Sequence, residues 1–264
     1  MKIGFIGCGN MATAMLKGIL KSGEVKAADM IASAKSDKTR EKIEKELGIQ
    51  KADTNAQVVD FADVVFLAVK PQFLEEVLDE IKDNVKEGQI FISIAPGKTL
   101  QWLGEHLGEG TKIIRTMPNT PAMVGEGMTA LCVNDLVTEE ETALAVKLCN
   151  TFGKSEVIPE HLMDAVVGVS GSSPAYVFMF LEAMADAAVV DGMPRAQAYK
   201  FAAQAVLGSA KLMLETGKHP GELKDMVCSP AGTTIQAVRV LEEKGLRSAV
   251  IEAQLECVKK AKGM

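Results

Sequence analysis

Aromatic side chains are scarce in this chain, and its net charge is not positive. Phenylalanine, tyrosine and tryptophan make up 5% of the 264 residues, with Trp102 as the single tryptophan, and the formal net charge is −6 at pH 7. A nucleic-acid-binding face needs clustered lysine and arginine to replace phosphate counterions, and a single-strand-binding face also needs aromatic rings for base stacking. We therefore expect no nucleic-acid partner.

Cysteine and histidine are few and scattered. The five cysteines include no C-x-x-C pair, and none of the three histidines lies near a cysteine or another histidine at metal-ligand spacing. This pattern is typical of free thiols in a reducing compartment, not of a disulfide framework or a zinc site. We expect no bound metal and a cytoplasmic location.

Long uninterrupted hydrophobic segments are missing as well. The N-terminal apolar run ends at Ile6 and is too short for a signal peptide. The most membrane-like stretch, 166–190, is interrupted by a Gly/Ser/Pro cluster at 171–174 and carries Glu182 and Asp186. We therefore expect no membrane association.

What the chain has is ordinary globular composition, with 47% hydrophobic and 24% charged residues, over a length that suits two domains. In the first part, short β-branched runs alternate with segments of helical spacing. This rhythm predicts an α/β domain over residues 1–159, with a mostly parallel, doubly wound sheet. Gly23 predicts the end of the first helix, and Thr138-x-x-Glu141 predicts a capping box. The predicted strands are Lys2–Ile6, Met30–Ala32, Val64–Val69, Gln89–Ile94 and Lys112–Arg115.

Residues 160–264 lack strand patterns and predict an all-helical domain. Within it, residues 176–190 are apolar nearly all round, relieved mainly by Glu182 and Asp186. Such a helix is buried on most sides, and the other helices of the domain cannot easily bury it alone. We predict that a second subunit supplies part of the cover, which makes this a dimerisation domain.

The first predicted strand runs into Gly7-Cys8-Gly9-Asn10-Met11-Ala12, a G-x-G-x-x-A pattern at a strand-to-helix turn. The first glycine permits the tight turn, the second lets the backbone approach a pyrophosphate, and the helix start offers free N–H groups to the anion. A glycine-rich turn can also serve geometry alone. Its place after a clean strand and before a helix favours a Rossmann domain that binds a dinucleotide.

The end of the second strand distinguishes the two dinucleotides. A carboxylate there accepts hydrogen bonds from the ribose 2′-OH of NAD, whereas this chain reads Ser33-Ala34-Lys35-Ser36. Hydroxyls and a cation suit a 2′-phosphate, so we predict NADPH, with NADH as the alternative. The simpler interpretation, that these residues only begin a solvated loop, stays open.

Two later strand ends, Ala68-Val69-Lys70-Pro71 and Ala95-Pro96-Gly97, pair small residues with a proline. Ligands of open α/β sheets bind beyond such carboxyl ends, and small residues let a nicotinamide ring approach the backbone. Lys70 is a catalytic acid, a cofactor contact or a surface lysine. Asn55 is an N-cap, a ribose contact or both.

In the helical half, Ser229-Pro230-Ala231-Gly232-Thr233-Thr234 reads as a loop that opens a helix. Backbone N–H groups at a helix start, with the helix dipole behind them, bind a small carboxylate without an arginine. The three hydroxyls add donors. The alternative is an ordinary N-cap, with serine or threonine serving its own helix.

Five segments, in order and spread over essentially the whole chain, resemble the pyrroline-5-carboxylate reductase family. They are Phe5–Ala12, Ala68–Gln72, Arg115–Pro121, Ser170–Tyr176 and His219–Thr234. The resemblance implies NAD(P)H-dependent reduction of the cyclic imine 1-pyrroline-5-carboxylate to L-proline, the last step of proline biosynthesis. It also implies a homodimer formed through the helical domains, with further assembly into a decamer left open.

The resemblance also implies roles for single residues. Thr234 is expected to act as the catalytic residue by hydrogen-bonding the ring nitrogen of the substrate. The expected substrate-binding residues are Glu160, Pro174, Ser229, Gly232, Thr233 and Thr234. The cofactor-binding residues expected from the motifs and the resemblance are Ile6, Gly7, Cys8, Gly9, Asn10, Met11, Ser33, Lys35, Asn55, Ala68, Val69, Lys70, Pro71, Ala95, Pro96 and Gly97.

Two other functions fit the same architecture. A hydroxyacid dehydrogenase would need a lysine or histidine acid in the helical half, where His161 and Lys200 are candidates that lie in no matching motif. A catalytically silent NADP-binding sensor or scaffold would have no need of a carboxylate-binding loop such as 229–234. We therefore expect a reductase that acts on a C=N bond.

Overall fold

The chain forms two compact units in a computed structural model that describes residues 1–263. The first, the sheet unit, comprises Met1–Gly171 together with the residues from Val258 onward. The second, the helical unit, comprises Ser172–Cys257. Each unit is described by itself below.

The sheet unit is built on one eight-stranded sheet with the order β3-β2-β1-β4-β5-β6-β7-β8. Neighbouring strands are parallel except for the antiparallel pair of β6 and β7, which confirms the predicted, mostly parallel sheet. The strands are β1 (Ile3–Ile6), β2 (Met30–Ser33), β3 (Gln50–Lys51), β4 (Val64–Leu67), β5 (Ile90–Ser93), β6 (Lys112–Met117), β7 (Gly127–Val133) and β8 (Gly153–Val157).

Three of these strands, β3, β7 and β8, were not among the predicted ones. Both residues of β3 are exposed, and β8 lies at the sheet edge with no buried residue. Neither segment carries the apolar run that marks a central strand. Strand β7 reverses direction after the 3₁₀ turn η3 (Thr120–Val124) and breaks the strand-helix rhythm on which the prediction relied.

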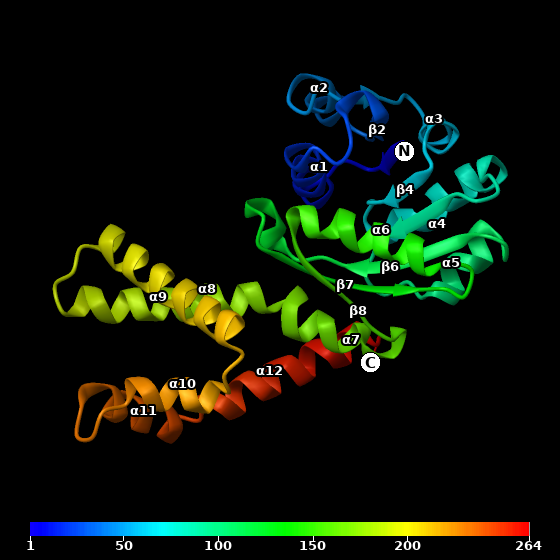
Figure 1. The fold of residues 1–264 in the computed structure, drawn as a ribbon. Coiled ribbons are helices and arrows are strands. Elements are labelled where there is room, and N and C mark those ends of the chain that lie inside the picture. The colour runs from blue at the N-terminus through cyan, green and yellow to red at the C-terminus, as the bar shows by residue number, and fades with distance from the viewer. Residues whose placement is uncertain (264) are drawn as a thin grey trace. The chain divides into compact units, whose positions relative to one another are not determined.

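Helices cover both faces of the sheet (Figure 1). On one face lie α1 (Asn10–Ser22), α2 (Asp37–Lys45) and α6 (Glu139–Cys149), and on the other lie α3 (Asn55–Phe61), α4 (Pro71–Ile81) and α5 (Leu100–Leu107). Side chains alternate between the two faces along each strand, so Phe5 and Phe66 stack at 4.4 Å between ring centroids on the first face, whereas Val65 and Phe91 belong to the second. The short elements η1 (Ala27–Asp29), η2 (Lys82–Asn84) and η4 (Asn150–Phe152) connect these layers.

The helix ends follow local chemistry. Gly23 takes the left-handed conformation after α1, and Thr138 with Glu141 forms the full capping box of α6, so both predictions are confirmed. The expectation that Asn55 could be an N-cap is wrong, because Thr54 caps α3 through its side chain and Asn55 is the first helical residue. Asn55 is thereby free to bond elsewhere.

Residues 160–171 close the first part of the sheet unit as η5 (Glu160–Leu162), α7 (Met163–Val166) and the π-helical turn η6 (Val167–Gly171). The Gly/Ser/Pro cluster was expected to interrupt this stretch, and Ser172 does form a bend between η6 and the next helix, but the residues on both sides of the bend are helical. As a result, Glu160–Val190 is long and apolar enough to cross a membrane by length and composition. An 18-residue window of this stretch has a mean hydropathy of 1.3, and 6% of that window is buried. The apolar surface of this stretch is therefore exposed, and either a lipid or another protein surface would cover it.

The helical unit consists of α8 (Ser173–Val190), α9 (Arg195–Thr216), α10 (Pro220–Val227), α11 (Thr233–Glu243) and most of α12 (Leu246–Ala261). Helices α8 and α9 pack side by side (Figure 1). Their buried residues are three alanines, Ala185, Ala198 and Ala202, whereas Phe178 is 64% and Leu214 84% exposed. Within the described chain, the apolar helix 176–190 is thus left largely uncovered.

Candidate active site

The carboxyl ends of the central strands form one edge of the sheet unit. Ile6 is paired in register with Ser33 of β2 and with Leu67 of β4, and Leu67 is paired with Ser93 of β5. The loops that follow these strands therefore lie along a single edge, where open α/β sheets bind ligands. This edge brings together the predicted cofactor residues of segments 6–11, 68–71 and 95–97, with Ser33 next to segment 6–11 on its outer side.

The glycine turn after β1 has the geometry that a phosphate needs. Gly7 has φ +93°, and a Cβ there would lie 2.7 Å from the carbonyl oxygen of Ala68, so only glycine fits. Gly9 is the N-cap of α1 and provides no side-chain cap, and a Cβ at Gly9 would meet nothing within 4 Å. The first N–H groups of α1 thus have no side-chain cap, and a ligand could approach Gly9 closely.

Cys8, between the two glycines, points inward. Its side chain is buried, and its Sγ lies 3.8 Å from Oγ1 of Thr13. Burial raises the pKa of the Cys8 thiol, so the residue stays neutral and places no negative charge beside a phosphate. Ala12 is also buried, which lets α1 pack closely on the sheet.

The end of β2 is linked by hydrogen bonds to α3 and, through α3, to α4. Both helices cover the face of the sheet that α1 does not cover. The hydroxyl of Ser33 donates to Oδ1 of Asn55 at 2.6 Å, and Nδ2 of Asn55 donates to Oε2 of Glu80 at 2.7 Å. Asn55 is therefore held at the end of β2, in part by a glutamate that the sequence motifs did not single out. A long-range contact of this kind leaves no local pattern to find.

The two lysines predicted for the cofactor lie at different points of this edge. The ammonium of Lys35 lies 5.0 Å from the ring centroid of Phe73 in α4. Lys70 occupies the exposed N-cap position of α4 and makes no side-chain capping bond. Other cations are closer to the glycine turn, around a cavity of about 390 Å³. That cavity is lined by Cys8, Gly9, Asn10, Lys38, Thr39, Glu41, Lys42, Lys45 and Glu46.

Hydrogen bonds to the ends of β5 and β6 hold the loop after β5 in place. Ala95 is buried and its N–H donates to Oγ of Ser93 at 3.3 Å, while Oγ1 of Thr116 donates to the carbonyl of Ser93 at 3.0 Å. Pro96 and Gly97 are exposed at the tip of the loop. The loop thus presents small residues at the edge on a fixed base.

The segment from Arg115 to Asn119 ties residues 160–171 to the sheet. Oε1 of Glu160 accepts from Nη1 of Arg115 at 3.0 Å and from the N–H of Leu100, at the start of α5, at 2.7 Å. The amide of Asn119 donates to the carbonyl of Ser170 at 2.9 Å and accepts from the N–H of Met128 at 2.8 Å. The motif therefore has a structural function that the sequence alone did not show, and one oxygen of Glu160 is already engaged.

In the helical unit, the loop between α10 and α11 forms a second uncapped helix start. The N-cap of α11 is Gly232, with no side-chain cap, so the interpretation in which serine or threonine caps this helix is wrong. A Cβ at Gly232 would lie 2.4 Å from Oγ of Ser229, so the Ser229 hydroxyl lies close to the backbone at the start of α11. Ala231 holds a left-handed backbone with φ 56°, Thr234 is half-buried, and Pro174 lies in the first turn of α8.

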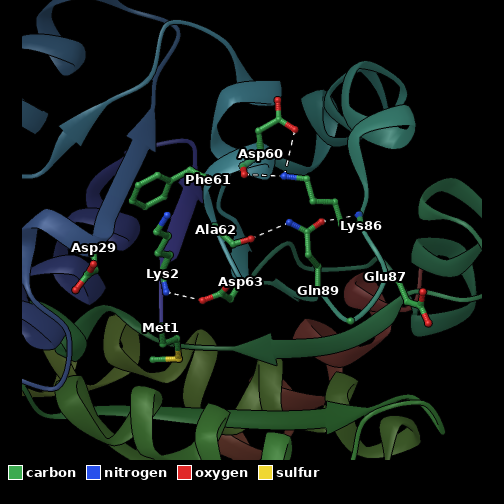
Figure 2. Close-up of a pocket in the computed structure, with 11 residues that line it drawn as sticks. Met1, Lys2, Asp29, Asp60, Phe61, Ala62, Asp63, Lys86, Glu87 and Gln89 are labelled. Atoms are coloured by element: carbon green, nitrogen blue, oxygen red, sulfur yellow. Dashed lines mark hydrogen bonds and ion pairs between the residues drawn. The ribbon is translucent and has the colours of Figure 1, made fainter.

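A larger cavity, of about 560 Å³, lies at the opposite, amino-terminal edge of the sheet. Figure 2 shows its polar side chains bonded to one another: Lys86 to Asp60, and Gln89 to the backbone of Ala62. The backbone N–H of Lys2 likewise donates to Asp63 at 2.7 Å. These bonds fasten the turns on that side of the sheet. Among residues 1–263, no cluster of three or more His, Cys, Asp or Glu side chains suits a metal ion.

Comparison with known proteins shows the family to which the chain belongs. Residues 160–264 match the family model for pyrroline-5-carboxylate reductase dimerisation, and residues 2–97 match the model for NADP oxidoreductase, coenzyme F420-dependent. The chain is 56% identical over 260 residues to the pyrroline-5-carboxylate reductase of Escherichia coli (strain K12), covering 98% of this chain and 97% of that one. The chain belongs to the pyrroline-5-carboxylate reductase family.

Solved structures agree with this membership. A pyrroline-5-carboxylate reductase from Coxiella burnetii superposes with a TM-score of 0.93 at 35% identity, covering 99% of this chain and 97% of that one. The pyrroline carboxylate reductase of Plasmodium falciparum, solved with NADP bound, gives a TM-score of 0.89 at 29% identity, covering 100% and 97%. The predicted family, fold class and enzyme class are confirmed: the chain is an NAD(P)H-dependent pyrroline-5-carboxylate reductase that forms L-proline.

Membership in the reductase family also explains the exposed apolar helices. The family model that covers residues 160–264 describes a dimerisation domain, and such a domain carries apolar surface for a second subunit. The apolar stretch Glu160–Val190 lies within this matched region.

Proposed function

We propose that this reductase binds NADPH along the carboxyl edge of its sheet unit and binds the carboxylate of the imine at the start of α11. The observation that carries the proposal is the glycine N-cap at Gly232, which leaves the first N–H groups of α11 without a side-chain partner. An anion is the natural partner of such a group of N–H donors, because the helix dipole adds to their hydrogen bonds. Ser229 and Thr233 add hydroxyl donors next to it.

In this proposal Thr234 acts on the ring nitrogen. NADPH, when bound, supplies a hydride whose two electrons convert the C=N bond of the imine into a C–N bond. The hydroxyl of Thr234 can accept from the N–H of a protonated imine and donate to the amine lone pair that develops, and solvent supplies the proton. No strong acid is required, since the protonated imine is already an electrophile. Positioning, with the imine carbon about 3 to 3.5 Å from the hydride donor, supplies most of the acceleration.

The predicted cofactor residues fit a dinucleotide with a 2′-phosphate. Gly7 to Met11 form the phosphate-binding turn, and no carboxylate stands at the end of β2 to repel a second phosphate. Segments 68–71 and 95–97 supply the small residues at the nicotinamide end. The bound NADP in the relative from Plasmodium falciparum supports NADPH, with NADH as the weaker cofactor.

We propose further that the enzyme is a cytoplasmic homodimer. Residues 160–264 would serve as the dimerisation and substrate-binding domain and residues 1–159 as the cofactor domain, with Glu160 and Pro174 near the substrate. The match to a dimerisation model supports the dimer. A decamer built from such dimers is the larger assembly that we propose to test by sedimentation at several protein concentrations.

The experiment that tests the activity follows NADPH oxidation by absorbance with 1-pyrroline-5-carboxylate as substrate. We expect NADPH consumption and formation of proline. Oxidation of hydroxy acids with NADP⁺, without reduction of the imine, would identify a hydroxyacid dehydrogenase instead. NADPH binding without any turnover would identify a sensor.

The role of Thr234 is tested by Thr234→Ala. We expect kcat/KM to fall about ten- to thirtyfold, the loss of one hydrogen bond worth ~1–2 kcal/mol. Thr216→Ala is the matched control, because the Thr216 hydroxyl bonds to the carbonyl of Leu212 in its own helix. An unchanged kcat/KM in Thr234→Ala would remove this hydroxyl from the mechanism.

A further inference from the structure

The groups expected to bind a 2′-phosphate at the end of β2 are engaged elsewhere. The hydroxyl hydrogen of Ser33 is donated to Asn55 at 2.6 Å, and Ser33 itself is buried. The ammonium of Lys35 lies over the ring of Phe73. A phosphomonoester carries nearly two negative charges and three acceptor oxygens, so a specific site for it needs cations that are free to donate.

Such cations are present on α2, the helix that follows β2. Lys38 and Lys42 lie one turn apart on the same face of α2 and line the cavity of about 390 Å³ next to Gly9 and Asn10. Neither forms an ion pair within residues 1–263. Lys42 is half-buried, which brings its charge close enough to Cys8 to oppose the rise in that thiol's pKa.

The acidic groups around this cavity do not cancel the two lysines. Glu41 is engaged by Lys45, with 3.1 Å between Nζ and Oε2. Glu46, the C-cap residue of α2, follows Lys42 by four positions and also lines the cavity, but it forms no ion pair with Lys42 within residues 1–263. The uncapped first turn of α1 faces the same cavity and carries no acidic residue. The cavity is therefore suited to an anion held between a helix start and a pair of ammonium groups.

We propose that Lys42, assisted by Lys38, binds the 2′-phosphate of NADPH in this cavity and so sets the preference of the enzyme for NADPH over NADH. The proposal rests on the proposed function, in that the dinucleotide must occupy the sheet edge. A lysine ammonium can donate to either cofactor, but only the phosphate of NADPH adds a negative charge to the hydrogen bond, whereas the 2′-hydroxyl of NADH is neutral. The residues lie on α2, outside the glycine turn and outside the strand-end loop where a charge was expected.

The test measures direct binding as well as turnover. Lys42→Met keeps the apolar stem and removes the charge, and dissociation constants for NADPH, NADH and adenosine 2′,5′-bisphosphate are measured by calorimetry on substrate-free enzyme. We expect NADPH and adenosine 2′,5′-bisphosphate to bind about tenfold more weakly, the value of one charge-assisted hydrogen bond, and NADH to bind as before. Lys42→Arg should retain most of the affinity, and Lys38→Met should show a smaller, equally selective loss.

Lys21→Met is the matched control, since it removes one exposed lysine at the other end of α1. An equal loss for NADH and NADPH in Lys42→Met would assign the lysine to the pyrophosphate and overturn the proposal. Unchanged NADPH binding would overturn it too, while leaving the proposed function intact. Failure of the unmodified enzyme to bind any dinucleotide would instead contradict the proposed function.

Discussion

Two helices of this reductase, α1 in the sheet unit and α11 in the helical unit, begin in the same unusual way. Each has a glycine at its N-cap, no side-chain capping bond and no acidic residue in its first turn. The nearby helices α2, α3, α5 and α6 are instead capped by Ser36, Thr54, Thr99 and Thr138. The shared omission leaves N–H donors available at both places.

The two helix starts differ in what holds them. Helix α1 buries six of its residues against the sheet, so its start is fixed by the chain's own core. Helix α11 has no buried residue in the described chain. The comparison teaches that a local sequence pattern is enough to leave N–H donors for the proposed anion sites. The rigidity of the proposed site at α11 depends on packing that a second subunit would supply in the helical unit.

The largest effect is expected where a carboxylate replaces the missing cap of α1. Gly9→Asp has room for its side chain, and Asp is a good N-cap, so the melting temperature should not fall. The new charge occupies the phosphate position, so NADPH should bind about 100-fold more weakly, or ~2.7 kcal/mol. Titration of NADPH measures the affinity. Gly9→Ala is the control for the added Cβ, and tight NADPH binding by Gly9→Asp would show that the phosphates bind elsewhere.

The corresponding change at α11 should affect the other substrate. Gly232→Asp is expected to raise KM for 1-pyrroline-5-carboxylate about thirtyfold, or ~2 kcal/mol, and to leave NADPH affinity unchanged. Steady-state kinetics with each substrate varied separates the two constants. Gly232→Ala adds the Cβ that approaches Ser229 without adding charge. A parallel loss of NADPH affinity in Gly232→Asp would mean that the two helix starts do not have separate ligands.

A smaller effect is expected at the end of β2. Ser33→Ala removes the hydroxyl that positions Asn55, and should weaken NADPH binding about fivefold, or ~1 kcal/mol. Fluorescence titration of NADPH checks this. Ser22→Ala, which removes a hydroxyl bonded to Ile19 at the distal end of α1, should bind normally. If Ser33→Ala binds normally as well, the bond between Ser33 and Asn55 serves the fold alone.

No effect on catalysis is expected from the buried thiols of the sheet unit. Burial raises the pKa of Cys132 and of Cys149 to about 12, so the reactive thiolate is scarce at neutral pH. Because the unfolded chain ionises these thiols at lower pH, their contribution to stability is complete below pH 9 and is lost between that value and about 12. Mass spectrometry after alkylation should find both cysteines modified only with denaturant. Modification of the native enzyme at the denatured rate would contradict the raised pKa values.

Much of the fold was predictable, because the central strands are apolar and separated by helices with clear caps. The edge strands β3 and β8 escaped prediction since their residues are exposed, and an exposed edge needs no apolar run. The glycine turn was recognisable for a physical reason: Gly7 stands where a Cβ would strike Ala68, and such a position tolerates no other residue.

The parts of the site that were missed depend on contacts between distant residues. Glu80 reaches Asn55 across 25 positions of sequence, and Arg115 reaches Glu160 across 45. The choice of Gly232 over Ser229 as the N-cap of α11 depends on how the preceding loop turns, which composition does not specify. The lysine pair on α2 had a visible i, i+4 spacing, but its nearness to the glycine turn is a tertiary fact.

Ala231 gives the loop before α11 a property that bears on how the enzyme uses binding energy. An alanine in the left-handed region costs about 1–2 kcal/mol, yet it leaves the unfolded loop fewer conformations than glycine would. In the proposed function, folding and subunit assembly order this loop before the substrate arrives, so the entropy lost in ordering the loop does not weaken substrate binding. A receptor that is preorganised in this way can hold a small, rigid ring without the large contact area that a flexible one would require.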